Sequence, residues 1–203
     1  MKDLNKKSVF AGNKYMNITS TKFLKGVVGE DEIFSDGTPQ VAFIGRSNVG
    51  KSSLINALTN SKISRASSFP GRTQELNVFL VNNSLYFVDL PGYGFSRVSG
   101  AGKEKLTDLI DCYLFNKSFT QKKIVLIIDA NVGMTDKDVS MFDELVYHKK
   151  DFVIALSKID KMNQSEYHHK LNEIKQITGQ HILFPFSSTT KKGIDKLLNC
   201  ILE

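Results

Sequence analysis

The stretch VAFIGRSNVGKSSLINAL at residues 41–58 decides the fold. It opens with the apolar run 41–44, passes through a glycine-bounded loop and continues into a segment, 52–59, with the character of a helix. Gly45, Gly50, Lys51 and Ser52 match the pattern G-x-x-x-x-G-K-S, which forms a phosphate-binding loop between a strand and a helix. A glycine-rich turn without a ligand is the alternative, but the flanking strand and helix favour the phosphate loop.

The residue types in this loop suit phosphate and Mg²⁺. Its glycines allow backbone N–H groups to face a phosphate with no side chain in the way, and the helix N-terminus adds partial positive charge. Lys51 is expected to reach the β- and γ-phosphates, and the Ser52 hydroxyl is expected to bind Mg²⁺. The loop residues expected to contact a nucleotide are Gly45, Arg46, Ser47, Asn48, Val49, Gly50, Lys51, Ser52 and Ser53.

Short apolar runs and amphipathic segments alternate along the rest of the chain. The further runs, typical of buried strands, are 76–81, 85–88, 124–128, 152–156 and 182–184. The further helical segments are 103–116, 136–148, 166–178 and 194–202. Asn82-Asn83 predicts a tight hairpin and one antiparallel strand. We therefore predict an α/β fold, with a doubly wound, mostly parallel six-stranded sheet that has one antiparallel strand and is flanked by helices.

Helical periodicity also predicts which residues face the core. Segment 103–116 places Leu106, Leu109, Ile110 and Tyr113 on one face, and 136–148 does the same with four further residues. These are Val139, Phe142, Leu145 and Val146.

The bulk composition fits one domain with a hydrophobic core. The chain has 203 residues, and we expect 1–36 to be an N-terminal extension that packs on a domain formed by 37–203. Cys112 and Cys200 suit neither a metal site nor a disulfide framework. The net charge of +6 fits either a nucleic-acid partner or a solvated lysine-rich surface. Because no secretory signal or membrane-length apolar run is present, we expect a cytoplasmic protein with no membrane association.

A second motif, Asp89-Leu90-Pro91-Gly92, directly follows the run 85–88. A carboxylate there can hold Mg²⁺, and the Gly92 N–H can approach a γ-phosphate unobstructed. The motif alone is weak evidence, since an ordinary turn has the same composition. Its place on a strand next to the phosphate loop favours the metal site.

A third segment, Gly71-Arg72-Thr73-Gln74-Glu75, lies between these two motifs. Thr73 resembles the switch threonine that adds a hydroxyl ligand to Mg²⁺ when a γ-phosphate is present. Arg72 is either a built-in arginine finger or a residue that contacts solvent or a partner.

Ser157-Lys158-Ile159-Asp160 follows the run 152–156 and resembles the base-recognition motif of translation-factor-like GTPases, which begins with Asn or Thr. The resemblance implies that Asp160 accepts hydrogen bonds from guanine N1–H and its amino group, while the Lys158 stem packs on the base. Ser157 departs from the motif, but its hydroxyl can make a similar tethering bond. Phe186-Ser187-Ser188 resembles the loop whose backbone N–H meets guanine O6.

Taken together, these motifs resemble the EngB (YihA/YsxC) family of bacterial GTPases over roughly residues 20–203. PGRTQ at 70–74 and DLPGYGF at 89–95 are the specific elements. The resemblance implies the P-loop GTPase fold, hydrolysis of GTP to GDP, and assembly of the large ribosomal subunit through its rRNA and proteins. It also implies a role in cell division and septation, and we expect a monomer. The alternatives are a GTP-dependent switch with negligible hydrolysis and an ATP-dependent P-loop enzyme.

The residues expected to act in catalysis are Lys51, Thr73, Gly92 and Asn48, and those expected to bind Mg²⁺ are Ser52, Thr73 and Asp89. Tyr93 follows Gly92 where Ras-like GTPases keep a water-orienting Gln, so intrinsic hydrolysis is expected to be slow. Asn48 matches the position at which related GTPases bind K⁺, which would supply positive charge. The alternative for Asn48 is a loop residue that bonds the neighbouring backbone.

Overall fold

The computed structural model describes residues 17–64, 75–94 and 101–203, and it confirms the doubly wound α/β fold. One sheet has the strand order β1-β3-β4-β2-β5-β6-β7. The strands are β1 (Thr21–Val27), β2 (Gln40–Gly45), β3 (Leu76–Val81), β4 (Leu85–Asp89), β5 (Lys123–Asp129), β6 (Phe152–Ser157) and β7 (Leu183–Pro185). The helices are α1 (Lys51–Leu58), α2 (Ala101–Phe115), α3 (Asp136–Tyr147), α4 (Gln164–Thr178) and α5 (Ile194–Leu202), with 3-10 turns η1 (Glu32–Phe34) and η2 (Ile159–Lys161).

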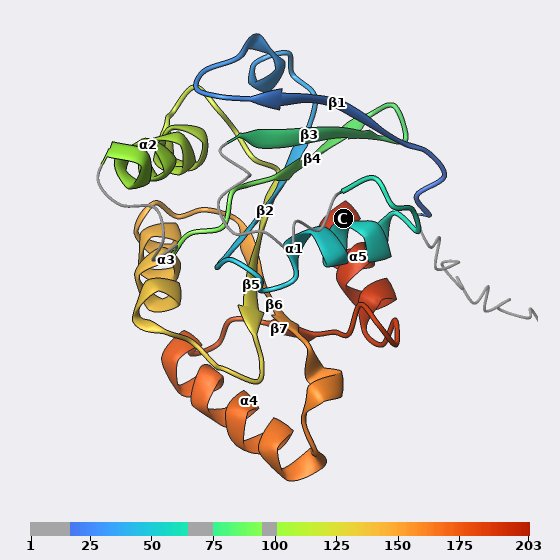
Figure 1. Ribbon diagram of the computed structural model, residues 1–203, viewed down its shortest axis with the longest axis vertical. Coiled ribbons are helices and arrows are strands. Elements are labelled where there is room, and N and C mark those ends of the chain that lie inside the picture. The colour runs from blue at the N-terminus through green and yellow to red at the C-terminus, as the bar shows by residue number, and fades with distance from the viewer. Residues whose placement is uncertain (1–16, 65–74, 95–100) are drawn as a thin grey trace, which may run out of the picture.

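Over the ranges that the structure describes, the sheet has seven strands, one more than expected. The additional strand, β1, comes from the N-terminal extension and pairs antiparallel with β3 at the edge of the sheet (Figure 1). Only Val27 of this strand is buried, so it lacks the apolar run by which the other strands were predicted. The hairpin between β3 and β4 is confirmed, because Asn82 and Asn83 both have positive φ, 48° and 52°.

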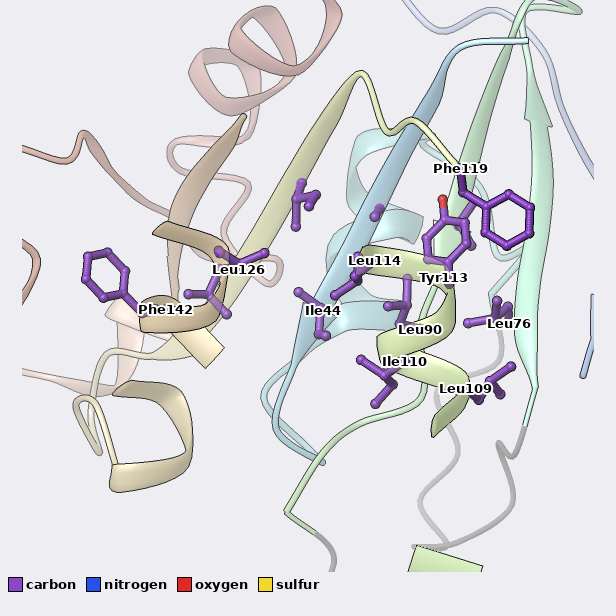
Figure 2. Packing of buried hydrophobic residues seen from close by; sticks show 14 of the residues in the cluster. Ile44, Leu76, Leu90, Leu109, Ile110, Tyr113, Leu114, Phe119, Leu126 and Phe142 are labelled. Atoms are coloured by element: carbon purple, nitrogen blue, oxygen red, sulfur yellow. The ribbon is translucent and has the colours of Figure 1, made fainter. Parts of the chain in front are cut away.

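Helices cover both faces of the sheet (Figure 1). Residues of α2, α3 and α4 pack in one hydrophobic cluster, and residues of α1 and α5 pack in the other. In the first cluster the α2 residues Leu109, Ile110 and Tyr113 point at the sheet as predicted, with Tyr113 beside Phe119 (Figure 2).

One predicted core residue of α3 is not in the core. Val146 is 45% exposed, whereas Asp138, Phe142 and Leu145 are buried. Asp138, Phe142 and Leu145 follow the spacing i, i+4, i+7, and Val146 is turned one residue further round the helix. The buried face of α3 thus begins with a carboxylate in place of an apolar residue.

The topology brings the carboxyl ends of four parallel strands together at the same end of the sheet. Their last residues are Gly45 of β2, Asp89 of β4, Asp129 of β5 and Ser157 of β6. Asp89 pairs in register with Phe43, and Asp129 with Ser157, so the loops that follow are neighbours. None of the helices in the described ranges combines the length and apolar character needed to cross a membrane.

Candidate nucleotide site

The phosphate loop has the expected position between β2 and α1. Two residues turn it through left-handed conformations, Asn48 with φ 62° and Gly50 with φ 106°. The buried Lys51 ammonium lies inside the loop and donates to the carbonyl oxygens of Gly45 at 3.2 Å and Arg46 at 3.4 Å. The side chain is therefore held where a phosphate would meet it.

The remaining loop residues support this arrangement. Val49 is buried, and its N–H donates to the Arg46 carbonyl at 3.3 Å. Ser52 and Ser53 lie half-buried in the first turn of α1, behind Lys51. The backbone carbonyl of Gly50 accepts from the Leu54 N–H at 2.8 Å, which starts the helix.

Asp89 faces this first turn. The Ser52 hydroxyl donates to Asp89 Oδ2 at 3.1 Å, and the Ser64 hydroxyl donates to the same oxygen at 3.1 Å. Asp89 Oδ1 is buried and has no hydrogen-bond partner among the described residues. An ionised carboxylate beside a serine hydroxyl is an oxygen donor set of the kind that Mg²⁺ prefers. Ser52 and Asp89 thus fit the metal.

Burial shifts the pKa values of both Lys51 and Asp89. It lowers the pKa of Lys51, an effect opposed by the nearby charge of Asp89. It raises the pKa of Asp89, an effect opposed by Lys51 and by hydrogen bonds from Ser64 and Ser52. A phosphate beside Lys51 and a cation beside Asp89 would each favour the charged form that burial disfavours.

The segment after Asp89 packs directly against the phosphate loop. The Leu90 N–H donates to the Phe43 carbonyl at 3.0 Å, and Pro91 and Gly92 are buried. A Cβ atom on Gly92 would lie 2.8 Å from the backbone nitrogen of Ser47 and 2.9 Å from its Cα. Only glycine allows this approach.

Tyr93 is directed to α3. Its hydroxyl donates to Asp138 Oδ1 at 2.8 Å. The switch residues Gly71, Arg72, Thr73 and Gln74 lie outside the described residues, and Glu75 is exposed just before β3.

The loop after β6 is joined to the phosphate loop. The Ser157 hydroxyl donates to the carbonyl oxygens of Val49 at 2.7 Å and Ile128 at 3.2 Å. The Lys158 ammonium donates to the Asn48 carbonyl at 2.8 Å and forms an ion pair with Asp129 Oδ2 at 2.6 Å. A serine at position 157 therefore makes a tethering bond.

The segments that follow β6 and β7 lie next to each other. Asp160 is exposed in η2, and the preceding Ile159 N–H lies 3.5 Å from the Phe186 carbonyl. Phe186 and Ser187 are buried, and Ser188 is half-buried. A Cβ atom on Gly193, which has φ 80°, would run into the carbonyl oxygen of Pro185, so the chain crosses closely behind this loop.

Three residues of the site were missed from the sequence. Asp129 directly follows the apolar run 124–128, and its position at a strand end is a signal that could have found it. Ser64 and Asp138 belong to no motif, and only the folded chain brings them to Asp89 and Tyr93.

Comparison with known proteins agrees with this geometry. The family described as 50S ribosome-binding GTPase matches residues 40–158. The protein described as probable GTP-binding protein EngB of Clostridium perfringens is 38% identical over 192 residues, which cover 93% of this chain and 97% of that protein. The chain belongs to the EngB family of GTP-binding proteins.

Other members of the family and solved structures agree. The EngB protein of Lachnospira eligens is 44% identical over 167 residues, 80% of this chain and 79% of that protein. A crystal structure described as a probable GTP-binding protein engB has a TM-score of 0.68 and 25% identity, covering 80% of this chain and 96% of that one. Era of Aquifex aeolicus shares the fold, with a TM-score of 0.61 and 24% identity over 80% of this chain and 55% of that one. As an EngB-type protein, this chain is a GTP-binding member of the P-loop GTPases, which use Mg²⁺.

Proposed function

We propose that this protein hydrolyses GTP to GDP and acts as a switch in the assembly of the large ribosomal subunit. The observation that carries the proposal is the meeting of Lys51, Ser52 and Asp89 at the end of β2 and β4, with Asp89 Oδ1 buried and without a hydrogen-bond partner among the residues that the structure describes. This arrangement suits a magnesium–triphosphate group. Two observations support the large ribosomal subunit as the partner. The family is described as a 50S ribosome-binding GTPase, and the net charge of +6 suits an RNA surface.

The roles follow from the positions of the side chains. Lys51 neutralises charge on the β- and γ-phosphates, while the Gly92 N–H meets the γ-phosphate. Ser52 and Asp89 hold Mg²⁺, and Thr73, which lies outside the described residues, adds a further hydroxyl. When bound, Mg²⁺ stabilises the negative charge that develops on the phosphoryl oxygens during transfer.

The loops after β6 and β7 recognise the guanine base. Asp160, exposed at the rim, accepts from the N1–H and amino group of the base, and the Lys158 stem packs on its face. In the Phe186-Ser187-Ser188 loop, the N–H groups of Phe186 and Ser187 donate to the Leu156 and Lys192 carbonyl oxygens, so the Ser188 N–H is the one proposed to meet O6. An ATP-dependent enzyme, one of the alternatives, does not agree with membership of a GTP-binding family.

We further propose that intrinsic hydrolysis is slow and that a partner or K⁺ stimulates it. The Tyr93 hydroxyl is engaged with Asp138, which supports a site without a water-orienting amide. Asn48 is exposed in the loop, where K⁺ could supply positive charge, although its positive φ of 62° is in itself a reason for asparagine there. Equal turnover in KCl and NaCl would remove the potassium proposal.

We also propose that the protein is a cytoplasmic monomer. Its role in subunit assembly is proposed to link it to cell division and septation. The test of the assembly role is co-sedimentation with ribosomal subunits in GDP, in a non-hydrolysable GTP analogue and without nucleotide. We expect pelleting with the large subunit that depends on the nucleotide. Equal or absent pelleting in all three states would defeat the assembly role.

A switch that binds GTP but barely hydrolyses it is the second candidate, favoured by the engaged Tyr93 hydroxyl. Single-turnover hydrolysis with and without large subunits separates the two. Acceleration by the subunits supports the enzyme, whereas a negligible rate in both conditions supports the pure switch.

A further inference from the structure

Asp138 lies behind the phosphate loop, in the first turn of α3, with its side chain completely buried. Its Oδ1 accepts the hydrogen bond from the Tyr93 hydroxyl at 2.8 Å, and its Oδ2 lies 2.8 Å from Nε of Arg46. Arg46 is the second residue of the phosphate loop, and Tyr93 directly follows Gly92. One carboxylate therefore contacts both segments that face the γ-phosphate position.

The position of this carboxylate is fixed by its own helix. The backbone N–H and the hydroxyl of Thr135 both donate to Asp138 Oδ2, at 2.9 Å and 2.8 Å. This capping arrangement orients the side chain, and the ion pair with Arg46 compensates for burying its charge. The group is thus a rigid anchor.

The backbones of the two segments are also in contact. Arg46 and Tyr93 form a parallel bridge, and the Ser47 N–H donates to the Tyr93 carbonyl at 3.2 Å. Gly92 packs on Ser47 so closely that a Cβ atom would not fit. Small shifts of Tyr93 would therefore move Gly92 relative to the loop.

The Tyr93 hydroxyl remains a hydrogen-bond donor to Asp138. Burial raises the pKa of Tyr93, and the neighbouring Asp138 raises it further, so the hydroxyl remains protonated. The Tyr93 hydroxyl and the two Thr135 donors satisfy the carboxylate by hydrogen bonds, and the Arg46 guanidinium balances its charge.

We infer that Asp138 is a positioning residue that sets the distance between the phosphate loop and Gly92, and thereby the ability of the site to tell GTP from GDP. The inference rests on the proposed γ-phosphate contact of Gly92. GDP has no γ-phosphate to meet Gly92, and its contacts are with the phosphate loop and the base-recognition loops, so loss of this anchor acts mainly on GTP. A purely structural role in capping α3 would instead affect both nucleotides equally.

The test uses Tyr93→Phe and Asp138→Asn in the full chain. The affinities for GDP and for GMPPNP are measured in Mg²⁺, together with thermal unfolding of the GDP complex. We expect the affinity for GMPPNP to fall about tenfold, as for the loss of one hydrogen bond to a charged group, and that for GDP to change less than about threefold.

The matched control is Tyr86→Phe. Tyr86 makes an equivalent bond, 2.7 Å from its hydroxyl to Asp36 Oδ2, at the start of β4 and away from the loops at the strand ends. We expect this variant to keep the wild-type ratio of the two affinities. A ratio that also stays at the wild-type value in Tyr93→Phe overturns the inference, even if Asp138→Asn fails to fold. Absence of GTP hydrolysis by the wild type would count against the proposed function alone, since the ratio is read from binding.

Discussion

The Ser157 hydroxyl donates a 2.7 Å hydrogen bond to the backbone carbonyl of Val49, joining two loops that are 108 residues apart in the chain. A second bond, from Lys158 to the Asn48 carbonyl, runs beside it. The loop proposed to read the base and the loop proposed to hold the phosphates are therefore one connected unit.

We expect Ser157→Ala to weaken the binding of GDP and GTP alike, by about five- to tenfold. The substitution removes a buried hydrogen bond that contributes about 1 kcal/mol and leaves the Val49 carbonyl unpaired. Titration with a fluorescent GDP analogue measures the effect, and Ser157→Thr, which keeps the hydroxyl, is the control. Unchanged affinity in Ser157→Ala would show that the tether does not contribute to binding.

Asp160→Asn is expected to change the preferred base. An amide can accept from the xanthine N1–H and donate to its C2 carbonyl, but it cannot accept from both the N1–H and the amino group of guanine, so GDP affinity should fall by about 100-fold or more and XDP affinity should rise. Competition between GDP and XDP measures this change. Asp195→Asn, an exposed carboxylate at the start of α5, should leave both affinities alone. A variant that still prefers GDP would refute the role given to Asp160.

Gly193→Ala is expected to destabilise the fold by about 2 kcal/mol or more, a fall in Tm of roughly 4–8 °C. The added Cβ meets the Pro185 carbonyl oxygen, and φ at this position is 80°. Thermal unfolding measures the loss. Gly29→Ala separates the two causes, because Gly29 has φ 92° and no atom of the described part of the chain lies within 4 Å of its Cβ position. A smaller loss there than at Gly193 is the expected result, and equal losses would exclude the steric contact.

Magnesium-dependent binding is expected to weaken on acidification at a higher pH than for an ordinary aspartate. Mg²⁺ binds the ionised carboxylate, burial raises the pKa of Asp89 above 3.8, and protons compete with the metal as the pH falls through that raised value. The gain in GDP affinity on adding Mg²⁺, measured from pH 8 down to pH 4, gives the profile.

Ser64→Ala provides the matched variant for this experiment. The Ser64 hydrogen bond lowers the pKa of Asp89, so its removal should shift the profile to higher pH. An unshifted profile would mean that a group other than Asp89 controls the loss of magnesium-dependent binding at low pH.

The sequence predicted those parts of the site whose chemistry is local. Asp89 and Ser157 directly follow apolar runs, Lys51 ends the loop after another such run, and their neighbours along the chain restrict what they can contact. Asp138 could not be found in this way, because an aspartate in the first turn of a helix usually caps it and is solvated. Its burial depends on Arg46 and Tyr93, which lie far from it along the chain.

The missed strand has the same explanation. β1 carries Lys22 and Lys25 among its exposed residues, and its place in the sheet comes from its partner β3. Likewise, Val146 was predicted to be a core residue, but it lies one residue further round α3 than the buried Leu145 and is exposed.

The position of β1 has a consequence for how the protein behaves in a crowded cell. Its partner, β3, is rich in apolar residues and would be a bare sheet edge without it, open to pairing with strands of other chains. β1 covers that edge and presents lysines outward, which discourages further strand addition, while β7 at the opposite edge has only three residues. The N-terminal strand therefore protects the domain against aggregation, and a shortened chain that begins after Val28 should lose solubility before it loses its nucleotide loops.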